Sequence, residues 1–515
     1  MHQLNRQDTG FLYSETPRLL MHLGSLHTYD PSGAPGGTVG FETILDHVRS
    51  RLPLARVLRR RIVRVPLGLD YPYWVEDPDF DLEFHVRHIA LPRPGNWRQL
   101  WTQATRLHSQ PLDLNRPPWE LYVIAGVDAV EGIPEGGFAM YIKVHHAAID
   151  GISGIELMNA LHDVTPEGRP APADDWRPDH VPSSLELAGR TALHLATTPT
   201  RLADFTVRTA NALRTTEGRR RPSVRLPARL PVTRLNQKAT LRRTAGGFVF
   251  DLDLARAVKR AVPGATVNDV ILTVVGGGLR SYLLGKGELP ADPLRAGVPV
   301  SLRTQEEMGT AGNRIGIMVV TVGTDVEDPV ERLRVVQQAT TASKEVSTAV
   351  PARAMAEAAE LLPGAMLGRA IRALPRVGAA GMASMIGNVC VTNVPGSQVP
   401  LYLCGARMDA YYGMGPVYDY AGPIHLITSY MRRIFVGVTT AKEIVPDIEH
   451  YVDCMERSLA ELVAATGADP ADVAPAKKAA KAARKTSKAA KKAAKATGTR
   501  ATKAASRAGR KQVER

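Results

Sequence analysis

The composition changes sharply near residue 474, and this change decides how much of the chain can fold around a core. Residues 474–515 contain 15 Lys or Arg and a single acid, Glu514, and they lack Leu, Ile, Phe and Trp. A segment without large apolar side chains cannot bury enough surface to offset its loss of conformational entropy. We therefore expect a disordered basic tail over residues 468–515, which could bind DNA or anionic lipid electrostatically and become helical there.

The same tail accounts for the charge of the whole chain. The 515 residues include 65 Lys or Arg and 51 Asp or Glu, which gives a net charge of +14. Once the tail is set aside, 50 basic and 50 acidic residues remain, so the rest of the chain is neutral. The high isoelectric point therefore says nothing about partners of the folded body.

The body is long enough for two domains and has the composition of a protein from a reducing compartment. Its three cysteines (Cys390, Cys404 and Cys454) lie far apart without CxxC spacing, which argues against a disulfide framework or a thiolate metal site. No apolar run approaches the roughly 20 residues that span a bilayer. The opening "MHQLNRQDTG" has neither the basic nor the apolar region of a signal peptide. These features predict a cytoplasmic protein.

Strand-like and helix-like segments alternate in both halves of the body, which predicts an α/β fold with two lobes and a cleft between them. We expect the first lobe over residues 1–175, a helical and then Pro/Arg-rich crossover over 176–240, and the second lobe over 241–467. In the first lobe, "FAMYIKVHH" and the alternation from Phe80 to Val86 predict strands, and "ISGIELMNALHDV" predicts a helix. The apolar stretch 352–386 could line a tunnel, dock on a membrane or form a buried helix pair.

The segment "KVHHAAIDG" (143–151) carries the most suggestive chemistry. Adjacent residues of a strand point to opposite faces, so His145 and His146 are poorly placed to bind one metal ion, and the i, i+4 pair that helical metal sites use is absent. Asp150 could cap the following helix, unless Ser153 and Glu156 form a capping box instead. From this segment alone, a buried structural histidine and a general base both remain open.

Further segments of the chain decide between these two interpretations of the histidines, because they occur in the order typical of one family. "LNRQDTGFLYSETPRLLMHLGSL", "PLDLNRPPWELYVI", "TVNDVIL", "VPVSLR" followed by "GN", and "VTNVPG" accompany HHAAIDG. Together they resemble the bacterial wax ester synthase/diacylglycerol acyltransferases, a branch of the CoA-dependent acyltransferases with the HHxxxDG motif. The resemblance covers about residues 1–465. Pro118 replaces the usual Leu of the PLD motif and Ser397 the last Pro of the NVPGP-type motif.

The resemblance implies an architecture and a reaction. It implies two chloramphenicol-acetyltransferase-like lobes joined by a long crossover, with the active site in the channel between them. It implies acyl transfer from acyl-CoA, as co-substrate and without a further cofactor, to a hydrophobic alcohol. Diacylglycerol is the first expected acceptor and gives triacylglycerol, whereas long-chain alcohols would give wax esters. Because such substrates are insoluble, we expect a protein peripheral to membranes or lipid bodies.

The resemblance also implies roles for individual residues. His146 would be the general base, for which the unperturbed histidine pKa of about 6.5 is suitable, and His145 would orient it. Asp150 would shape the site by pairing with an arginine, for which Arg303 is the candidate, and Gly151 would permit the tight turn that follows. Three further residues would bind substrate or shape the site, namely Asn268, Asp269 and Asn313.

Several of these motif residues have a structural reading as well. "TVND" is also a helix capping box, which favours a structural role for Asp269. Gly276–Gly278 lies within a helical pattern and predicts close helix packing rather than a nucleotide loop. Asp113, Arg116 and Trp119 predict a polar brace and an aromatic anchor.

Two other functions stay open at this point. The body could be an inactive acyltransferase whose basic tail tethers lipid bodies to DNA, although the intact HHAAIDG argues against it. The chain could also transfer acyl groups to a specialised acceptor, such as a polyketide or glycolipid hydroxyl.

Overall fold

The computed structural model describes residues 1–149, 154–194, 196, 230–301, 315–347, 387–469 and 471. Among the predicted features, the turn at Asp150 and Gly151, the stretch 352–386 and the basic tail from residue 472 onward lie outside these residues. So do Arg303 and Asn313.

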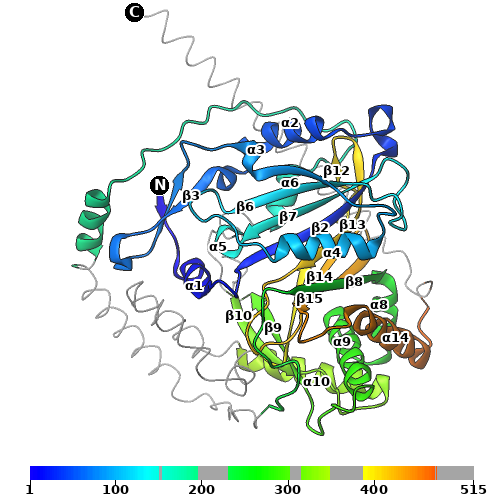
Figure 1. Cartoon of the computed structure of the whole chain (residues 1–515). Helices are drawn as coiled ribbons and strands as arrows, with labels where there is room; N and C mark the ends of the chain where they lie inside the picture. The colour runs from blue at the N-terminus through cyan, green and yellow to red at the C-terminus, as the bar shows by residue number, and fades with distance from the viewer. Residues whose placement is uncertain are drawn as a thin grey trace, which may run out of the picture.

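Two six-stranded sheets dominate the described part of the chain (Figure 1). The first has the strand order β12 (Tyr402–Leu403), β13 (Ala406–Met414), β2 (His22–Asp30), β7 (Phe138–His145), β6 (Trp119–Ala125) and β5 (Val86–Ala90). The second has the order β10 (Ile315–Thr321), β9 (Arg295–Ser301), β11 (Val389–Pro395), β14 (Ile424–Tyr430), β15 (Arg433–Ala441) and β8 (Arg243–Asp251). A small third sheet has the order β1 (His2–Gln3), β4 (Tyr73–Glu76) and β3 (Arg60–Val63).

Helices cover both large sheets. Those of the N-terminal half include α1 (Arg6–Ser14), α2 (Phe41–Arg51), α3 (Leu82–His85), α4 (Trp97–His108), α5 (His146–Ile149) and α6 (Gly154–Leu161), and residues 184–194 are helical as well. Those of the C-terminal half are α8 (Leu252–Val258), α9 (Val267–Leu284), α10 (Pro329–Ser347) and α14 (Ile448–Thr466). Short 3₁₀ turns lie at η1 (Pro31–Gly33), η2 (Pro35–Gly37), η3 (Leu52–Leu54), η4 (Arg56–Arg59), η5 (Pro66–Gly68) and η6 (Lys259–Ala261).

The two-lobed α/β fold predicted from the sequence is confirmed, with one exchange between the halves. Strand β13 follows residue 400 in the chain, yet it pairs antiparallel with β2 of the N-terminal half over Arg407–Asp30 to Met414–Gly24. Residues 402–414 therefore complete the first sheet rather than the second. Helix α4 lies at the junction of the two sheets (Figure 1), where Trp97 and Trp101 pack against Tyr412 of β13.

The strand predicted from Phe80 to Val86 is wrong in its first part. Residues Leu82–His85 form the one-turn helix α3, because the side chain of Asp81 accepts a hydrogen bond from the backbone of Glu83 and starts a helical turn. The strand begins only at Val86.

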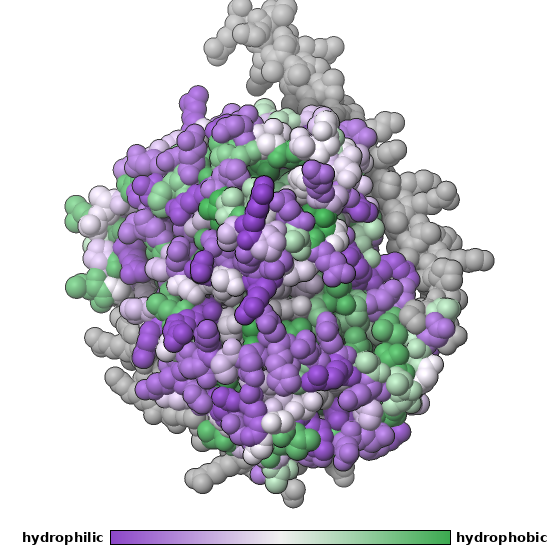
Figure 2. Space-filling view, turned by 45° about the vertical axis from the view of Figure 1, so that its right-hand side comes forward, coloured by the Kyte–Doolittle hydropathy of each residue, from purple (hydrophilic) through white to green (hydrophobic). Residues whose placement is uncertain are grey.

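The glycine triplet of α9 permits close helix packing, as its position within a helical pattern predicts. A Cβ at Gly276 would overlap the carbonyl oxygen of Val322, one at Gly277 the hydroxyl of Ser458, and one at Gly278 the side chain of Met455. The triplet lets α9 approach its neighbours to backbone contact distance. On the face of the molecule shown in Figure 2, hydrophilic residues predominate and hydrophobic ones form small separate areas.

Candidate active site

The histidine pair lies where β7 ends and α5 begins. Strand β7 is buried along its whole length, because β2 and β6 flank it and both of its faces are covered. His145 is the last residue of β7 and His146 the first of α5. The change from strand to helix thus falls between the two histidines, and their rings occupy different environments.

Neighbouring segments fix the backbone of both histidines. The amide of His145 donates to the carbonyl of Pro118 at 2.9 Å, and the amide of His146 donates to the carbonyl of Met21 at 2.7 Å. Pro118 belongs to the PLD motif and precedes β6, whereas Met21 precedes β2. Two sequence motifs that lie far apart in the chain thus hold the pair from opposite sides.

The ring of His145 is buried and held at both nitrogens. Its Nε2 lies 2.7 Å from Oε2 of Glu15, and its Nδ1 accepts a hydrogen bond from the amide of Ala147 at 3.1 Å. Because Nδ1 is an acceptor, the proton of the neutral ring is on Nε2, which donates to Glu15. Sequence reasoning did not identify Glu15, which lies in the quoted segment "LNRQDTGFLYSETPR" but outside any recognisable catalytic pattern.

His146 is partly exposed as a residue, and its ring stacks on Phe11 of α1, with 3.7 Å between the ring centroids and 26° between the planes. Its Nδ1 is buried and makes no hydrogen bond of good geometry to a described residue. Burial, followed by the nearby His145, lowers the pKa of His146 to about 4, and the contact with its own backbone carbonyl offsets this only in part. His146 is therefore neutral at physiological pH, and Nε2 is the nitrogen available to a reacting hydroxyl.

A buried charge network supports β7 just before the pair. Nζ of Lys143 lies 2.9 Å from Oε2 of Glu120 and donates to the carbonyl oxygens of Leu107, in the last turn of α4, and Gln110, just after the helix. Burial lowers the pKa of Lys143, and Glu120 partly opposes that effect. The network joins β7, β6 and α4 into one rigid support.

Two hydrogen bonds to backbone oxygens join the two halves of the chain near this region. Arg243, at the start of β8, donates to the carbonyl of Arg18, close to the segment that holds His146. Nε2 of His108, at the end of α4, lies 3.0 Å from the carbonyl of Gly415. The histidine pair is thus close to the contact between the two lobes.

The remaining predicted residues within the described chain, Asn268 and Asp269, lie in the first turn of α9. Asp269 is buried; one carboxylate oxygen completes the capping box with Thr266, as the sequence predicted, and the other accepts from the hydroxyl of Thr340. Asn268 lies in the first turn of the same helix and is partly exposed. Among the described residues, no hydrogen bond or ion pair links Asn268 or Asp269 to the histidine pair.

The PLD motif forms the brace and anchor that the sequence predicted. Arg116 pairs with Asp113 at 3.8 Å, and the indole of Trp119 donates to the carbonyl of Leu58 at 2.7 Å. Trp119 also stacks on His85.

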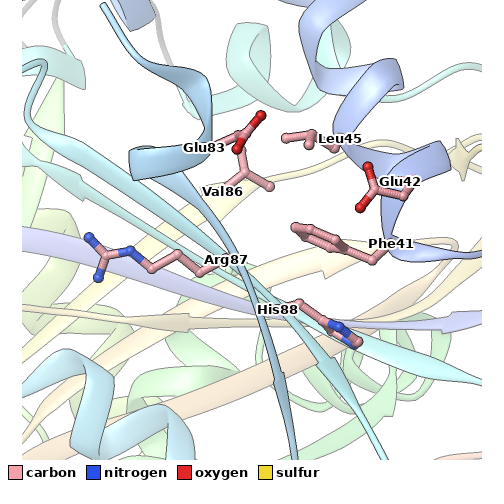
Figure 3. A pocket seen from close by; sticks show the side chains of 7 residues that line it. All are labelled: Phe41, Glu42, Leu45, Glu83, Val86, Arg87 and His88. Atoms are coloured by element: carbon pink, nitrogen blue, oxygen red, sulfur yellow. The ribbon is translucent and has the colours of Figure 1, made fainter.

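A pocket between α2 and β5 is separate from the histidine pair (Figure 3). It is lined by Phe41 and Glu42 of α2 and by Arg87 and His88 of β5, the edge strand on the far side of β6. The histidine pair does not line it. Within the described ranges, no three His, Cys, Asp or Glu side chains are grouped so as to hold a metal ion. No helix in the same ranges has the length and apolar character needed to cross a bilayer.

The two-lobed architecture is shared with solved structures of other proteins. The first condensation domain of the calcium-dependent antibiotic synthetase shares the fold with a TM-score of 0.53 and 18% identity, covering 91% of this chain and 97% of that domain. A wax ester synthase/diacylglycerol acyltransferase from Marinobacter aquaeolei VT8 is more similar, with a TM-score of 0.66 and 28% identity, covering 91% of this chain and all of that one.

Sequence comparison narrows the class to one family. The wax ester synthase/diacylglycerol acyltransferase catalytic domain matches residues 4–271, and the C-terminal domain of the same family matches residues 311–463. A Mycobacterium tuberculosis protein named as a diacylglycerol O-acyltransferase is 34% identical over 464 residues, which cover 89% of this chain and 99% of that protein. The chain belongs to the wax ester synthase/diacylglycerol acyltransferase family.

Proposed function

We propose that this protein transfers the acyl group of an acyl-CoA to the free hydroxyl of diacylglycerol, which yields triacylglycerol and CoA. The observation that carries the proposal is the family match over both lobes, with HHAAIDG intact at the end of a buried central strand. Relatives named as diacylglycerol O-acyltransferases support this acceptor. A long-chain alcohol is the second acceptor we propose, because the similar Marinobacter enzyme is also named as a wax ester synthase.

His146 is the proposed general base. Its Nε2 takes the proton of the acceptor hydroxyl while that oxygen attacks the thioester carbonyl. When the tetrahedral intermediate collapses, the carbon–sulfur bond breaks and the imidazolium returns the proton to the CoA thiolate. The low pKa of His146 keeps the ring neutral before the attack and makes the imidazolium a strong acid for the second step.

The roles proposed for the other motif residues follow the same scheme. His145 orients the segment that carries the base, since both of its ring nitrogens are bound within the protein. Asp150 and Arg303 are proposed to shape the site as a pair, with Gly151 forming the turn. Asn268 and Asn313 remain proposed site-shaping residues, whereas the contacts of Asp269 support a purely structural role.

The direct test measures acyl transfer from radiolabelled palmitoyl-CoA by the purified protein. Diacylglycerol and hexadecanol are offered separately, and the products are resolved by chromatography. Formation of triacylglycerol or wax ester by the wild type supports the proposal and ranks the two acceptors. If no hydroxyl acceptor is acylated, the proposed function is wrong.

We propose that the enzyme works in the cytoplasm at the surface of a membrane or lipid body, because both acceptors are insoluble in water. Leu67 and Leu69 support this proposal. They are 88% and 45% exposed on one turn after β3, and large apolar side chains presented together at a surface favour contact with lipid. Leu67→Ser/Leu69→Ser should weaken co-flotation with triolein emulsions. Leu284→Ser, at a 58% exposed leucine at the end of α9, is the matched control and should float with the emulsion like the wild type.

The basic tail favours one additional function. Its 15 basic residues and single acid support binding of DNA or anionic lipid, with an affinity that falls steeply as salt rises. Deleting residues 474–515 should abolish this binding and preserve acyl transfer. Loss of acyl transfer in the deletion variant would place the tail in the enzyme's own function.

A further inference from the structure

Helix α1 and the segment after it contact both histidines of the motif. Phe11 stacks on the ring of His146, the carboxylate of Glu15 binds the ring of His145, and the carbonyl of Met21 accepts from the backbone of His146. One short stretch near the N-terminus thus supplies three separate contacts to two adjacent residues. We call Phe11, Glu15 and Met21 the N-terminal clamp.

Glu15 fixes the tautomer of His145 and thereby holds its ring in place. The side chain of His145 is 1% exposed and that of Glu15 is 14% exposed, so the hydrogen bond between them is largely shielded from water. Because the amide of Ala147 occupies Nδ1, only Nε2 can carry the proton of the neutral ring. Without Glu15, this N–H would be buried without an acceptor, which is costly enough to make the ring move.

Movement of His145 would reach His146 through the backbone. Ala147, whose amide is bound by the His145 ring, lies in the first turn of α5, and His146 lies between the two residues. The hydrogen bond between His145 and Ala147 therefore spans the residue proposed as the base. Phe11 also restricts His146, because a stacked neighbour at 3.7 Å limits rotation of its imidazole ring.

The clamp is itself anchored at both ends. The side chain of Asn5 accepts from the amide of Asp8 and caps α1, and Arg243 of the second lobe binds the carbonyl of Arg18 within the clamp segment. A position fixed at both ends can hold a ring to within the few tenths of an ångström that proton transfer requires.

We propose that Glu15 and Phe11 are positioning residues for the general base and that neither contacts the reacting atoms. This inference rests on the proposed function of His146. Glu15 acts as a hydrogen-bond acceptor for His145, and Phe11 acts as a stacking surface for His146. Together they hold Nε2 of His146 in the geometry that removes the acceptor proton.

The kinetic test compares Glu15→Ala with Glu15→Gln in the full-length protein. Glu15→Ala should lower kcat by about 10- to 100-fold with little change in KM for either substrate, since misplacing a base affects the chemical step. Glu15→Gln should recover most of the rate, because its amide oxygen can accept the same hydrogen bond. Glu42→Ala, at an exposed glutamate in the first turn of α2, is the control and should match the wild type.

Phe11 provides a second pair of variants if Glu15→Ala fails to fold. Phe11→Leu should lower kcat with unchanged KM, whereas Phe11→Tyr keeps the stack and should retain the rate. The proposal is overturned if Glu15→Ala and Phe11→Leu keep the wild-type kcat, if their losses lie in KM alone, or if the conservative variants lose as much as the truncated ones.

A measurement without turnover separates this inference from the proposed function. In protein labelled with ¹⁵N-histidine, His145 should show a protonated Nε2 and an unprotonated Nδ1, and Glu15→Ala should remove this pattern. An inactive wild type with this pattern would contradict the proposed function and leave the clamp intact. Absence of the pattern in the wild type would overturn the clamp.

Discussion

Lys143 and Glu120 form an ion pair of 2.9 Å inside the first sheet, two residues before the histidine pair, with 0% and 8% of their side chains exposed. A buried charge whose partner is removed loses the interaction that offset its desolvation. Glu120→Gln should therefore lower the free energy of unfolding by about 3–5 kcal/mol, measured by urea denaturation. Lys143→Met/Glu120→Gln should cost less than the two single changes added together. A near-neutral Glu120→Gln would show that the carbonyl oxygens around Lys143 suffice for its charge.

Replacing the proposed base should remove most of the activity and leave the fold intact. We expect His146→Ala to lower kcat by about 10²- to 10⁴-fold, the usual contribution of general acid–base catalysis. Radiolabelled acyl transfer measures the rate, and circular dichroism checks the fold. His180→Ala, at a histidine whose side chain is 80% exposed, is the matched control. Full activity of His146→Ala would exclude His146 as the base.

The pH dependence of kcat/KM should reflect the low pKa of His146. The neutral imidazole is the active form, and its pKa of about 4 keeps it neutral throughout the neutral range. The rate should therefore be flat from about pH 8 to pH 5.5 and fall towards a midpoint near 4, well below the ordinary histidine value of about 6.5. A midpoint near 6.5 in the free enzyme would show that the ring is more hydrated than its contacts indicate.

Mild acid should destabilise the fold through its buried histidines. Burial lowers the pKa of each of His22, His27, His108, His146, His162 and His425 in the folded state. Between these lowered values and about 6.5 the unfolded chain binds more protons, so stability is complete above about pH 6.5 and falls as pH decreases. The thermal midpoint should drop between pH 7 and pH 5, where most carboxylates are still ionised. A constant midpoint over this interval would contradict the prediction.

The packing role of Gly276 can be tested against a second glycine of the same helix region. A Cβ at Gly276 would overlap the backbone of Val322, whereas at Gly285, the C-cap of α9, its nearest neighbour would be 3.4 Å away. Gly276→Ala should lower the urea midpoint strongly, since backbone cannot yield as a side chain can. Gly285→Ala should leave it unchanged or raise it slightly. Equal effects of the two changes would show that α9 can shift.

The sequence predicts most of the local elements and fewer of the contacts between them. The helix from Val267, its capping box and the strand ending at His145 follow from periodicity and short-range hydrogen bonding, which depend on neighbours in the chain. Glu15 could not be assigned to His145 in this way. The two residues are 130 positions apart, and a single glutamate after a short helix has no distinctive pattern.

The placement of β13 shows the same limit for the fold. No strand was predicted over Ala406–Met414, and the sheet that such a strand joins depends on edges made by distant segments. The predicted division into one lobe before residues 176–240 and one lobe after them therefore did not include the pairing of residues 402–414 with β2.

This strand exchange sets an order of events during synthesis. Until residues 402–414 have left the ribosome, β2 lacks its neighbour on one side, although every other strand of its sheet has long been made. The edge of β2 would therefore stay unpaired until residue 414 has been made. Unpaired strand edges favour association with other chains. A nascent chain of this kind is a natural client for holding chaperones, and separate expression of the first 240 residues should yield an aggregating fragment rather than a lobe.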